Sequence, residues 1–273
     1  MSMDQAGKVA AFRALHARAG AFIIPNPWDA GSAKLLASQG FEALATTSIG
    51  VAFGLGRGDT VVSLDEIIEN CRVIVRATGL PVNADLENGG GETPEAAAAA
   101  IARAAEVGVA GGSIEDSSGD AAAPIYPFEQ AVARVRAAVA AARAVPSGFV
   151  LTARAENLIH GRADMEDTIK RLQAFSAAGA DVLYAPGLRS LAEVRAVVQA
   201  VDKPVNVVTG WLEQGITLAD LAAAGAKRIS VGGALQRRAL TALLEAGRMM
   251  AEEGSFAWAA GMVPTPEVRK RLG

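Results

Sequence analysis

Pro81-Val-Asn-Ala-Asp-Leu-Glu87 and Gly112-Ser-Ile-Glu-Asp116 are two short apolar runs, and each of them ends in a pair of acidic residues. Thr93–Val107, which lies between them, has helical periodicity and a high alanine content. A strand, a helix and a second strand in this order predict a parallel β-α-β unit with a right-handed crossover. In such a unit the two acidic pairs lie at the carboxyl ends of successive strands.

The same alternation extends along the whole chain. The apolar runs are Phe22–Pro25, Ala43–Ser48, Val82–Glu87, Gly111–Glu115, Phe149–Ala155, Val182–Ala185, Val205–Thr209 and Arg228–Val231. Helical segments separate these eight runs, and several of the helices end at a glycine, such as Gly108 and Gly179. We therefore predict an α/β fold, a (β/α)₈ barrel of the TIM type, over the alternative of an open doubly wound sheet.

The length and composition fit this architecture. The chain has 273 residues, a common length for one barrel, and no proline- or serine-rich linker divides it. We expect a single domain over residues 1–273. Met3–Ala19 predicts an extra helix before the first strand, and the chain from Ser255 predicts an extension past the last barrel helix.

Charge and composition exclude several classes of function. The formal net charge is −3, and no dense run of lysine or arginine offers a surface for nucleic acid. The amino-terminal residues have no apolar core typical of a signal peptide, and no apolar stretch is long enough to span a bilayer. A single cysteine, Cys71, excludes an intrachain disulfide. We expect a cytoplasmic protein with a small-molecule substrate and without a membrane or nucleic-acid partner.

The acidic residues at the strand ends are candidate metal ligands. Residues two apart on a strand face the same side, so Asp85 and Glu87 share a face, and Glu115 shares one with Ser113. Ionised carboxylates are costly to bury without a cation. A hard divalent ion, Mg²⁺ first, would offset that cost. Salt bridges to nearby arginines are the alternative, and Asp116, which faces away from Glu115, fits a structural role equally well.

Other polar residues near strand ends are candidates for substrate binding. Arg154 follows the fifth run and can bind a carboxylate or phosphonate through a bidentate fork, or can simply neutralise the acidic residues. Asn206 can orient a carboxylate oxygen, or can be a hydrogen-bonded core amide. Thr46-Thr-Ser-Ile-Gly50 offers backbone amides and hydroxyls for an anion. Asp59 lies in a glycine-rich loop, and Asp29 fits a helix N-cap better than a site role.

These residues, in this order, resemble the isocitrate lyase/phosphoenolpyruvate mutase superfamily from about Phe22 to Val231. The segments that carry the resemblance are Asn83-Ala-Asp-Leu-Glu-Asn-Gly-Gly-Gly91, Ser113-Ile-Glu-Asp116, Thr152-Ala-Arg154, Tyr184-Ala-Pro-Gly187 and Lys203-Pro-Val-Asn206. The resemblance implies a (β/α)₈ barrel whose last helix is commonly exchanged between the subunits of a homodimer or homotetramer.

The resemblance also implies a set of site residues. Mg²⁺, with Mn²⁺ as the alternative, would be held through Asp85, Glu87 and Glu115. A 2-oxo acid or related substrate would bind the metal. The residues implied for the substrate or the chemistry are Thr47, Ser48, Ile49, Asp59, Glu115 and Arg154, with Asn206 added from its place after the seventh run.

Three departures from the family pattern stand out. Isocitrate and methylisocitrate lyases carry a Lys-Lys-Cys-Gly-His loop after the fourth strand, and phosphoenolpyruvate mutases carry a Lys-Lys-Asn-Ser segment there. This chain has Ser117-Ser-Gly-Asp-Ala-Ala-Ala-Pro124 instead. Position 87, where relatives usually have aspartate, is a glutamate.

The sequence therefore predicts a Mg²⁺-dependent enzyme that breaks or forms a bond next to a 2-oxo acid. A lyase or decarboxylase acting on a C–C bond is the first hypothesis. A phosphonomutase or a phosphonopyruvate-type P–C hydrolase is the second. A barrel that binds small carboxylates without catalysis is the third.

Overall fold

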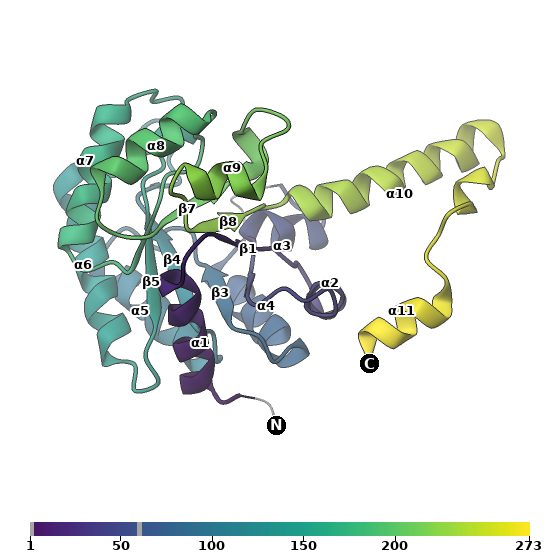
Figure 1. Ribbon diagram of the computed structural model, residues 1–273, viewed down its shortest axis with the longest axis horizontal. Helices are drawn as coiled ribbons and strands as arrows, with labels where there is room; N and C mark the ends of the chain where they lie inside the picture. Colours follow the sequence, from purple (N-terminus) through teal and green to yellow (C-terminus); the bar gives the residue numbers. More distant parts are fainter. Residues whose placement is uncertain (1–2, 59–61) are drawn as a thin grey trace.

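The computed structural model describes residues 3–58 and 62–273. Within these residues, parallel strands follow one another around a nearly closed barrel, with β1 next to β8 and each later strand next to its predecessor (Figure 1). The strands are β1 (Phe22–Ile24), β2 (Leu44–Ala45), β3 (Val82–Asp85), β4 (Gly111–Glu115), β5 (Val150–Arg154), β6 (Val182–Tyr184), β7 (Val205–Val208) and β8 (Arg228–Ser230). The amide of Ala45 donates to the carbonyl of Pro25 over 3.1 Å and joins the β2 edge to the end of β1. All the predicted strands and the barrel are confirmed.

Helices alternate with the strands and cover the outside of the barrel (Figure 1). They are α2 (Ala30–Ala37), α3 (Ser48–Gly54), α4 (Leu64–Ala77), α5 (Pro94–Glu106), α6 (Phe128–Ala144), α7 (Met165–Ala177), α8 (Leu191–Ala200), α9 (Leu218–Ala223) and α10 (Ala234–Glu253). Asp29 caps α2, since its carboxylate accepts from the amide of Ser32 over 2.7 Å, so the predicted cap is confirmed. Gly108 and Gly179 have φ values of 92° and 104°, as glycines that end helices should.

The extra amino-terminal helix is confirmed as α1 (Gln5–Ala17), and it packs against the amino-terminal end of the barrel. Phe12 of α1 is fully buried and makes an edge-to-face contact with Phe22 of β1. Gly111 at the start of β4 allows this close approach. A Cβ at that position would lie 2.5 Å from the carbonyl oxygen of Val150 and 3.1 Å from the Phe12 ring.

The barrel interior differs from the usual one. The interior of a TIM barrel is normally filled by bulky branched apolar side chains. In this barrel, buried polar side chains from β3, β4, β7 and β8 line a cavity instead: Asn83, Ser113, Asn206, Arg228 and Ser230. Apolar residues pack mainly between the strands and the surrounding helices. The cavity side of the interior is therefore polar, whereas apolar residues of β1, β2, β5 and β6 form a separate buried cluster with α1.

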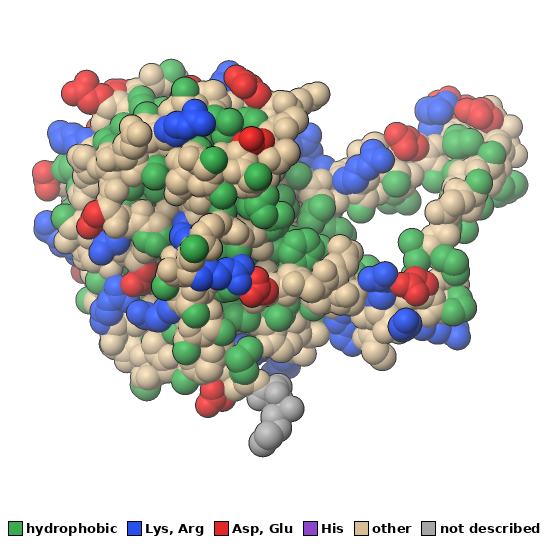
Figure 2. Space-filling view, viewed as in Figure 1, with side chains coloured by type: hydrophobic (Ala, Val, Ile, Leu, Met, Phe, Trp, Pro, Cys, Tyr) green, Lys and Arg blue, Asp and Glu red, His purple; other side chains and the backbone are tan. Residues whose placement is uncertain are grey.

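The carboxyl-terminal part of the chain extends away from the barrel. Figure 1 shows α10 projecting outward, followed by a connection that returns through α11 (Thr265–Leu272). Along this arm Leu243, Leu244 and Phe256 are 67%, 72% and 72% exposed, and apolar side chains are visible on it in Figure 2. The predicted helical extension is confirmed, whereas exchange of a helix between subunits stays a prediction. In the described chain, no helix combines the length and apolar character needed to cross a membrane.

Candidate active site

Asp85 is the last residue of β3 and is held by the segment that follows β2. One of its carboxylate oxygens, Oδ2, accepts from the Ser48 amide over 3.0 Å and from the Ser48 hydroxyl over 2.9 Å. The Asp85 amide donates to the Thr46 hydroxyl over 2.9 Å. Ser48 begins α3, so its free amide is one of the unpaired donors of a helix start. The β2–α3 junction thereby fixes the orientation of the Asp85 carboxylate.

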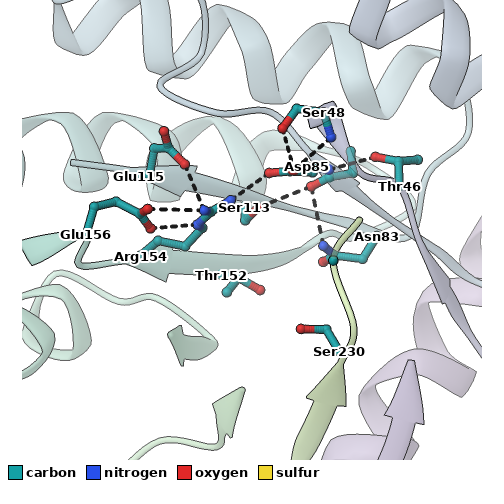
Figure 3. A network of polar contacts seen from close by, with 12 residues as sticks. Thr46, Ser48, Asn83, Asp85, Ser113, Glu115, Thr152, Arg154, Glu156 and Ser230 are labelled. Atoms are coloured by element: carbon teal, nitrogen blue, oxygen red, sulfur yellow. Dashed lines mark hydrogen bonds and ion pairs between the residues drawn. The ribbon is translucent and has the colours of Figure 1, made fainter. Parts of the chain in front are cut away.

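Arg154, the last residue of β5, lies among the carboxylates of three strand ends (Figure 3). Its Nη1 donates to Asp85 Oδ1 over 2.7 Å, and its Nη2 lies 3.1 Å from Glu115 Oε2. Its Nε donates to Glu156 Oε1 over 2.8 Å. The ring of Tyr184 lies 5.1 Å from the guanidinium carbon. The ion pair between Arg154 and Glu156, two residues further along the chain, is a finding of the structure.

The electrostatics of this cluster show a surplus of negative charge. Burial alone would lower the pKa of Arg154, but the charges of Glu115, Glu156 and Asp85 outweigh burial and raise it well above its ordinary value. Burial raises the pKa of Glu115 well above its ordinary value, and the pull of Arg154 does not cancel this effect. One guanidinium thus faces three carboxylates, so the charge of the cluster would favour a second cation.

The donor set is suited to a hard divalent ion, although the carboxylates are not gathered around one point. Among the described residues, no three acidic, histidine or cysteine side chains form a group of metal-binding geometry. Arg154 lies between Asp85 and Glu115 and pairs with both. Glu87 has a φ of 49°, a left-handed backbone conformation that turns the chain at the end of β3. The metal-ligand role of Asp85, Glu87 and Glu115 stays a prediction.

Asp116 belongs to a structural ion pair behind the site. Its Oδ1 accepts from the Glu156 amide over 2.8 Å, and its Oδ2 lies 3.1 Å from Arg171 Nη1. Asp116 and Arg171 are 2% and 3% exposed. Burial raises the pKa of Asp116 to about 6, although the Glu156 amide and Arg171 act in the opposite direction. Asp116 therefore anchors the backbone of Glu156, and the structural interpretation offered by its position on the strand is the better one.

Asn206 and Arg228 lie deeper in the barrel. Asn206 Oδ1 accepts from Arg228 Nε over 2.8 Å, and its Nδ2 donates to the Ser230 hydroxyl over 3.0 Å. Arg228 Nη2 donates to the Thr152 hydroxyl over 2.9 Å. Sequence reasoning missed Arg228, although an arginine at the start of an apolar strand was a visible signal.

A cavity of about 340 Å³ extends from Asp85 and Arg154 to Asn206 and Arg228. Its lining includes the predicted residues Thr47, Ser48, Ile49, Asp85, Arg154 and Asn206. Side chains from β3, β5, β7 and β8 and from the β2–α3 junction therefore meet in one space of a size typical for small ligands. Asp59, predicted as an acidic site residue, lies outside the described residues.

A cysteine and a histidine, residue types that often act in catalysis, lie apart from these site residues. Cys71 of α4 is fully buried, and burial raises the pKa of its thiol to about 12, so it is poorly suited to act as a nucleophile. His16 of α1 is half-buried beside Phe12 and Phe22, away from the carboxyl ends of the strands. In the loop after β4, Ser117 bridges to Ile125 and closes a short exposed turn.

Comparison with known proteins agrees with this geometry. The family model described as phosphoenolpyruvate phosphomutase matches residues 12–251. A structure from Burkholderia cenocepacia J2315, provisionally described as a lyase/mutase, is 54% identical, with a TM-score of 0.95 and coverage of 97% of this chain and 95% of that one. The 2-methylisocitrate lyase of Escherichia coli K12 is 32% identical over 214 residues, which cover 75% of this chain and 70% of the lyase.

A further solved structure, of an oxaloacetate acetylhydrolase in complex with the product oxalate, is 27% identical with a TM-score of 0.88. It covers 99% of this chain, and 96% of its own length is matched. The family resemblance predicted from the sequence motifs is confirmed. The chain therefore belongs to the phosphoenolpyruvate phosphomutase family, and is an enzyme of the PEP mutase/isocitrate lyase superfamily of lyases, decarboxylases and mutases.

Proposed function

We propose that this enzyme cleaves or forms a C–C bond next to the carbonyl of a small 2-oxo acid, with the help of Mg²⁺. The observation that carries the proposal is the cluster at the ends of β3, β4 and β5. There Arg154 and Asp85 line one cavity of about 340 Å³, and Arg154 also pairs with Glu115 and Glu156, so carboxylates outnumber the guanidinium. An anionic substrate and a divalent cation together would complete the charge balance of this cluster.

The metal would be held by Asp85 and Glu115, with Glu87 nearby at the turn after β3. When bound, a divalent ion would supply Lewis-acid polarisation of the substrate's keto oxygen. Mg²⁺ suits an all-oxygen donor set, and Mn²⁺ prefers similar ligands. The raised pKa of Glu115 supports this assignment, because a cation close to a buried carboxylate would stabilise its charged form.

The protein groups around the metal position would bind and orient the substrate. Arg154 offers its guanidinium to a carboxylate, and Thr47, Ser48 and Ile49 line the cavity beside it. Asp85 holds Arg154 Nη1, and Glu156 holds its Nε, so the guanidinium plane is fixed before substrate arrives. Asp59 is proposed to act as an acidic group from the loop after β2.

Removal of divalent metal tests this proposal directly. With EDTA, turnover of the active member of a panel of oxaloacetate, phosphonopyruvate and 2-methylisocitrate is expected to fall to background. Added Mg²⁺ or Mn²⁺ should restore it, because the buried carboxylates need a cation to act on the substrate. Product identification by NMR measures both the rate and the bond that is broken. Full activity in EDTA would contradict the metal role.

Phosphonomutase or P–C hydrolase chemistry is the second candidate, and the matched phosphomutase family model favours it. The loop after β4 (Ser117–Pro124) lacks the lysine residues of both the mutase segment and the lyase loop, so it does not separate the two reactions. The C–C reaction is placed first because the relatives include the 2-methylisocitrate lyase of Escherichia coli. Turnover of phosphonopyruvate alone in the same panel would establish the second candidate. Tight binding of these acids without turnover would instead indicate a non-catalytic barrel.

We further propose that the α10 arm mediates a homodimer or homotetramer. Leu243 and Leu244 are 67% and 72% exposed on a helix that leaves its own barrel, and exposed apolar side chains of this kind mark contact surfaces. Light scattering is expected to give a dimer or tetramer for the wild type. Leu243→Glu/Leu244→Glu should lower the molecular mass, whereas Val73→Glu, at an apolar position 38% exposed on α4, should leave it unchanged. A monomeric wild type would contradict the proposal.

A further inference from the structure

Arg228 of β8 is a cation buried within the barrel. It is 3% exposed, and its side chain lies among strands β5 and β7, where it donates to Thr152 and Asn206. Its remaining nitrogen, Nη1, is buried and makes no hydrogen bond to any residue that the structure describes. A buried guanidinium is costly unless its charge and its donors are both satisfied.

The groups that surround Arg228 are neutral. Its two acceptors are an amide and a hydroxyl, and the Phe12 ring lies 6.0 Å from its guanidinium carbon. Burial, with the charge of Arg228 as a second cause, lowers the pKa of the nearby His16 to about 3, so this ring is also neutral. Within the described chain, no carboxylate lies at ion-pairing distance from Arg228. Burial lowers the pKa of Arg228 itself to about 9, which reflects the absence of a counter-ion.

The unbalanced cation lines the same cavity as the proposed catalytic cluster. Arg228 bonds to Thr152, which precedes Arg154 by two residues on β5. Two residues along a strand correspond to roughly 6.6 Å. The cavity therefore has two cationic levels, with Arg154 at the mouth and Arg228 about one layer of side chains below it. The small side chains of Ser113 and Ala45 also line this cavity.

We propose that Arg228 binds a second acidic group of the substrate at the floor of the barrel, so that the enzyme selects small dicarboxylic 2-oxo acids over monocarboxylic ones. The inference rests on the proposed function, because it places the 2-oxo acid end at the level of Arg154. The other acid group would enter the lower cavity and supply the negative charge that Arg228 lacks. Asn206 and Thr152 are positioning residues, since they hold the guanidinium by its Nε and Nη2.

The test compares two acids with the same four-carbon chain. Oxaloacetate carries the second carboxylate, and 2-oxobutyrate has a methyl group in its place. Binding is measured in EDTA, where the proposed reaction does not proceed, by quenching of tryptophan fluorescence, since Trp211 lines the cavity. The wild type is expected to bind oxaloacetate about tenfold to a hundredfold more tightly, the range for a charge-assisted hydrogen bond in a buried site.

Three variants separate charge recognition from structure. Arg228→Met removes the charge, and Arg228→Gln removes it while keeping a donor. Both should reduce the preference for oxaloacetate to about one while 2-oxobutyrate binding stays within a few-fold. Arg143→Met is the matched control. Arg143 lies on α6 with its side chain 44% exposed and pairs with Asp181, whose carboxylate also accepts from the Leu151 amide of β5, and its loss should leave the preference unchanged.

The outcomes are distinct. An unchanged preference in a folded Arg228→Met or Arg228→Gln protein would overturn the inference, and if neither variant folds, a wild-type preference near one would overturn it. Its failure is separable from failure of the proposed function. A wild type that binds oxaloacetate selectively but turns over nothing with Mg²⁺ would retain the role of Arg228 and lose the reaction. A wild type that turns over a substrate with Mg²⁺ but binds oxaloacetate no more tightly than 2-oxobutyrate would retain the reaction and lose the role of Arg228.

Discussion

Asp85→Ala is expected to lower kcat/KM for the active substrate by about 10²–10³-fold, the usual loss for one preorganised electrostatic contact at a reacting centre. Asp85 would ligate the metal, and it also accepts from Arg154 Nη1 over 2.7 Å and from the Ser48 amide over 3.0 Å. The substitution therefore removes a metal ligand and frees Arg154 on one side. Steady-state kinetics at saturating Mg²⁺ measure the loss.

The matched control for this experiment is Asp65→Ala. Asp65 also pairs with an arginine, Arg103, but its side chain is 82% exposed on the outside of the barrel. Because exposed ion pairs contribute little, kcat/KM and stability should stay close to wild type. Full activity of Asp85→Ala would remove the basis of the proposed site. Circular dichroism should show both variants folded.

Arg171→Met is expected to lower the free energy of unfolding by about 3–5 kcal/mol at neutral pH, the typical cost of removing one partner of a buried ion pair. Asp116 is 2% exposed and would keep only the Glu156 amide as a partner for its charge. Urea denaturation measures the loss. Arg248→Met, which breaks an exposed pair with Glu252 and Glu253, should change stability by less than about 1 kcal/mol.

The pH dependence of this effect follows from Asp116. Its folded-state pKa of about 6 lies above its ordinary value of 3.8. A group with a raised pKa contributes its stability fully below the unfolded-state value and loses it as the pH rises through the folded-state value. Without Arg171 the charged form of Asp116 is still less stable in the folded protein. The loss of unfolding free energy in Arg171→Met should therefore be smaller at pH 5 than at pH 8. Substituting Asp116→Asn in the same protein should remove that difference, and an equal deficit at both pH values would contradict this account.

Much of the fold was predictable because its signals are local. The run from Val82 to Glu87 and the helix from Thr93 to Val107 show their periodicities within a few turns of chain, and the structure has β3 and α5 there. The extra helix α1 and the cap at Asp29 follow from equally local patterns.

The partners of the site residues depended on closure of the barrel. The order of apolar runs and helices was enough to predict a barrel with Asp85, Glu115 and Arg154 at its strand ends, and the motifs at those ends carried the resemblance to the superfamily. Only the tertiary structure decided that Arg154 joins Asp85, 69 residues away, and that Asp116 pairs with Arg171, 55 residues away. It also decided that Arg228 is buried with no counter-ion among the described residues. The reason is physical. Periodicity reports which face of its own element a side chain occupies, whereas ion pairing and burial depend on which distant elements close around it.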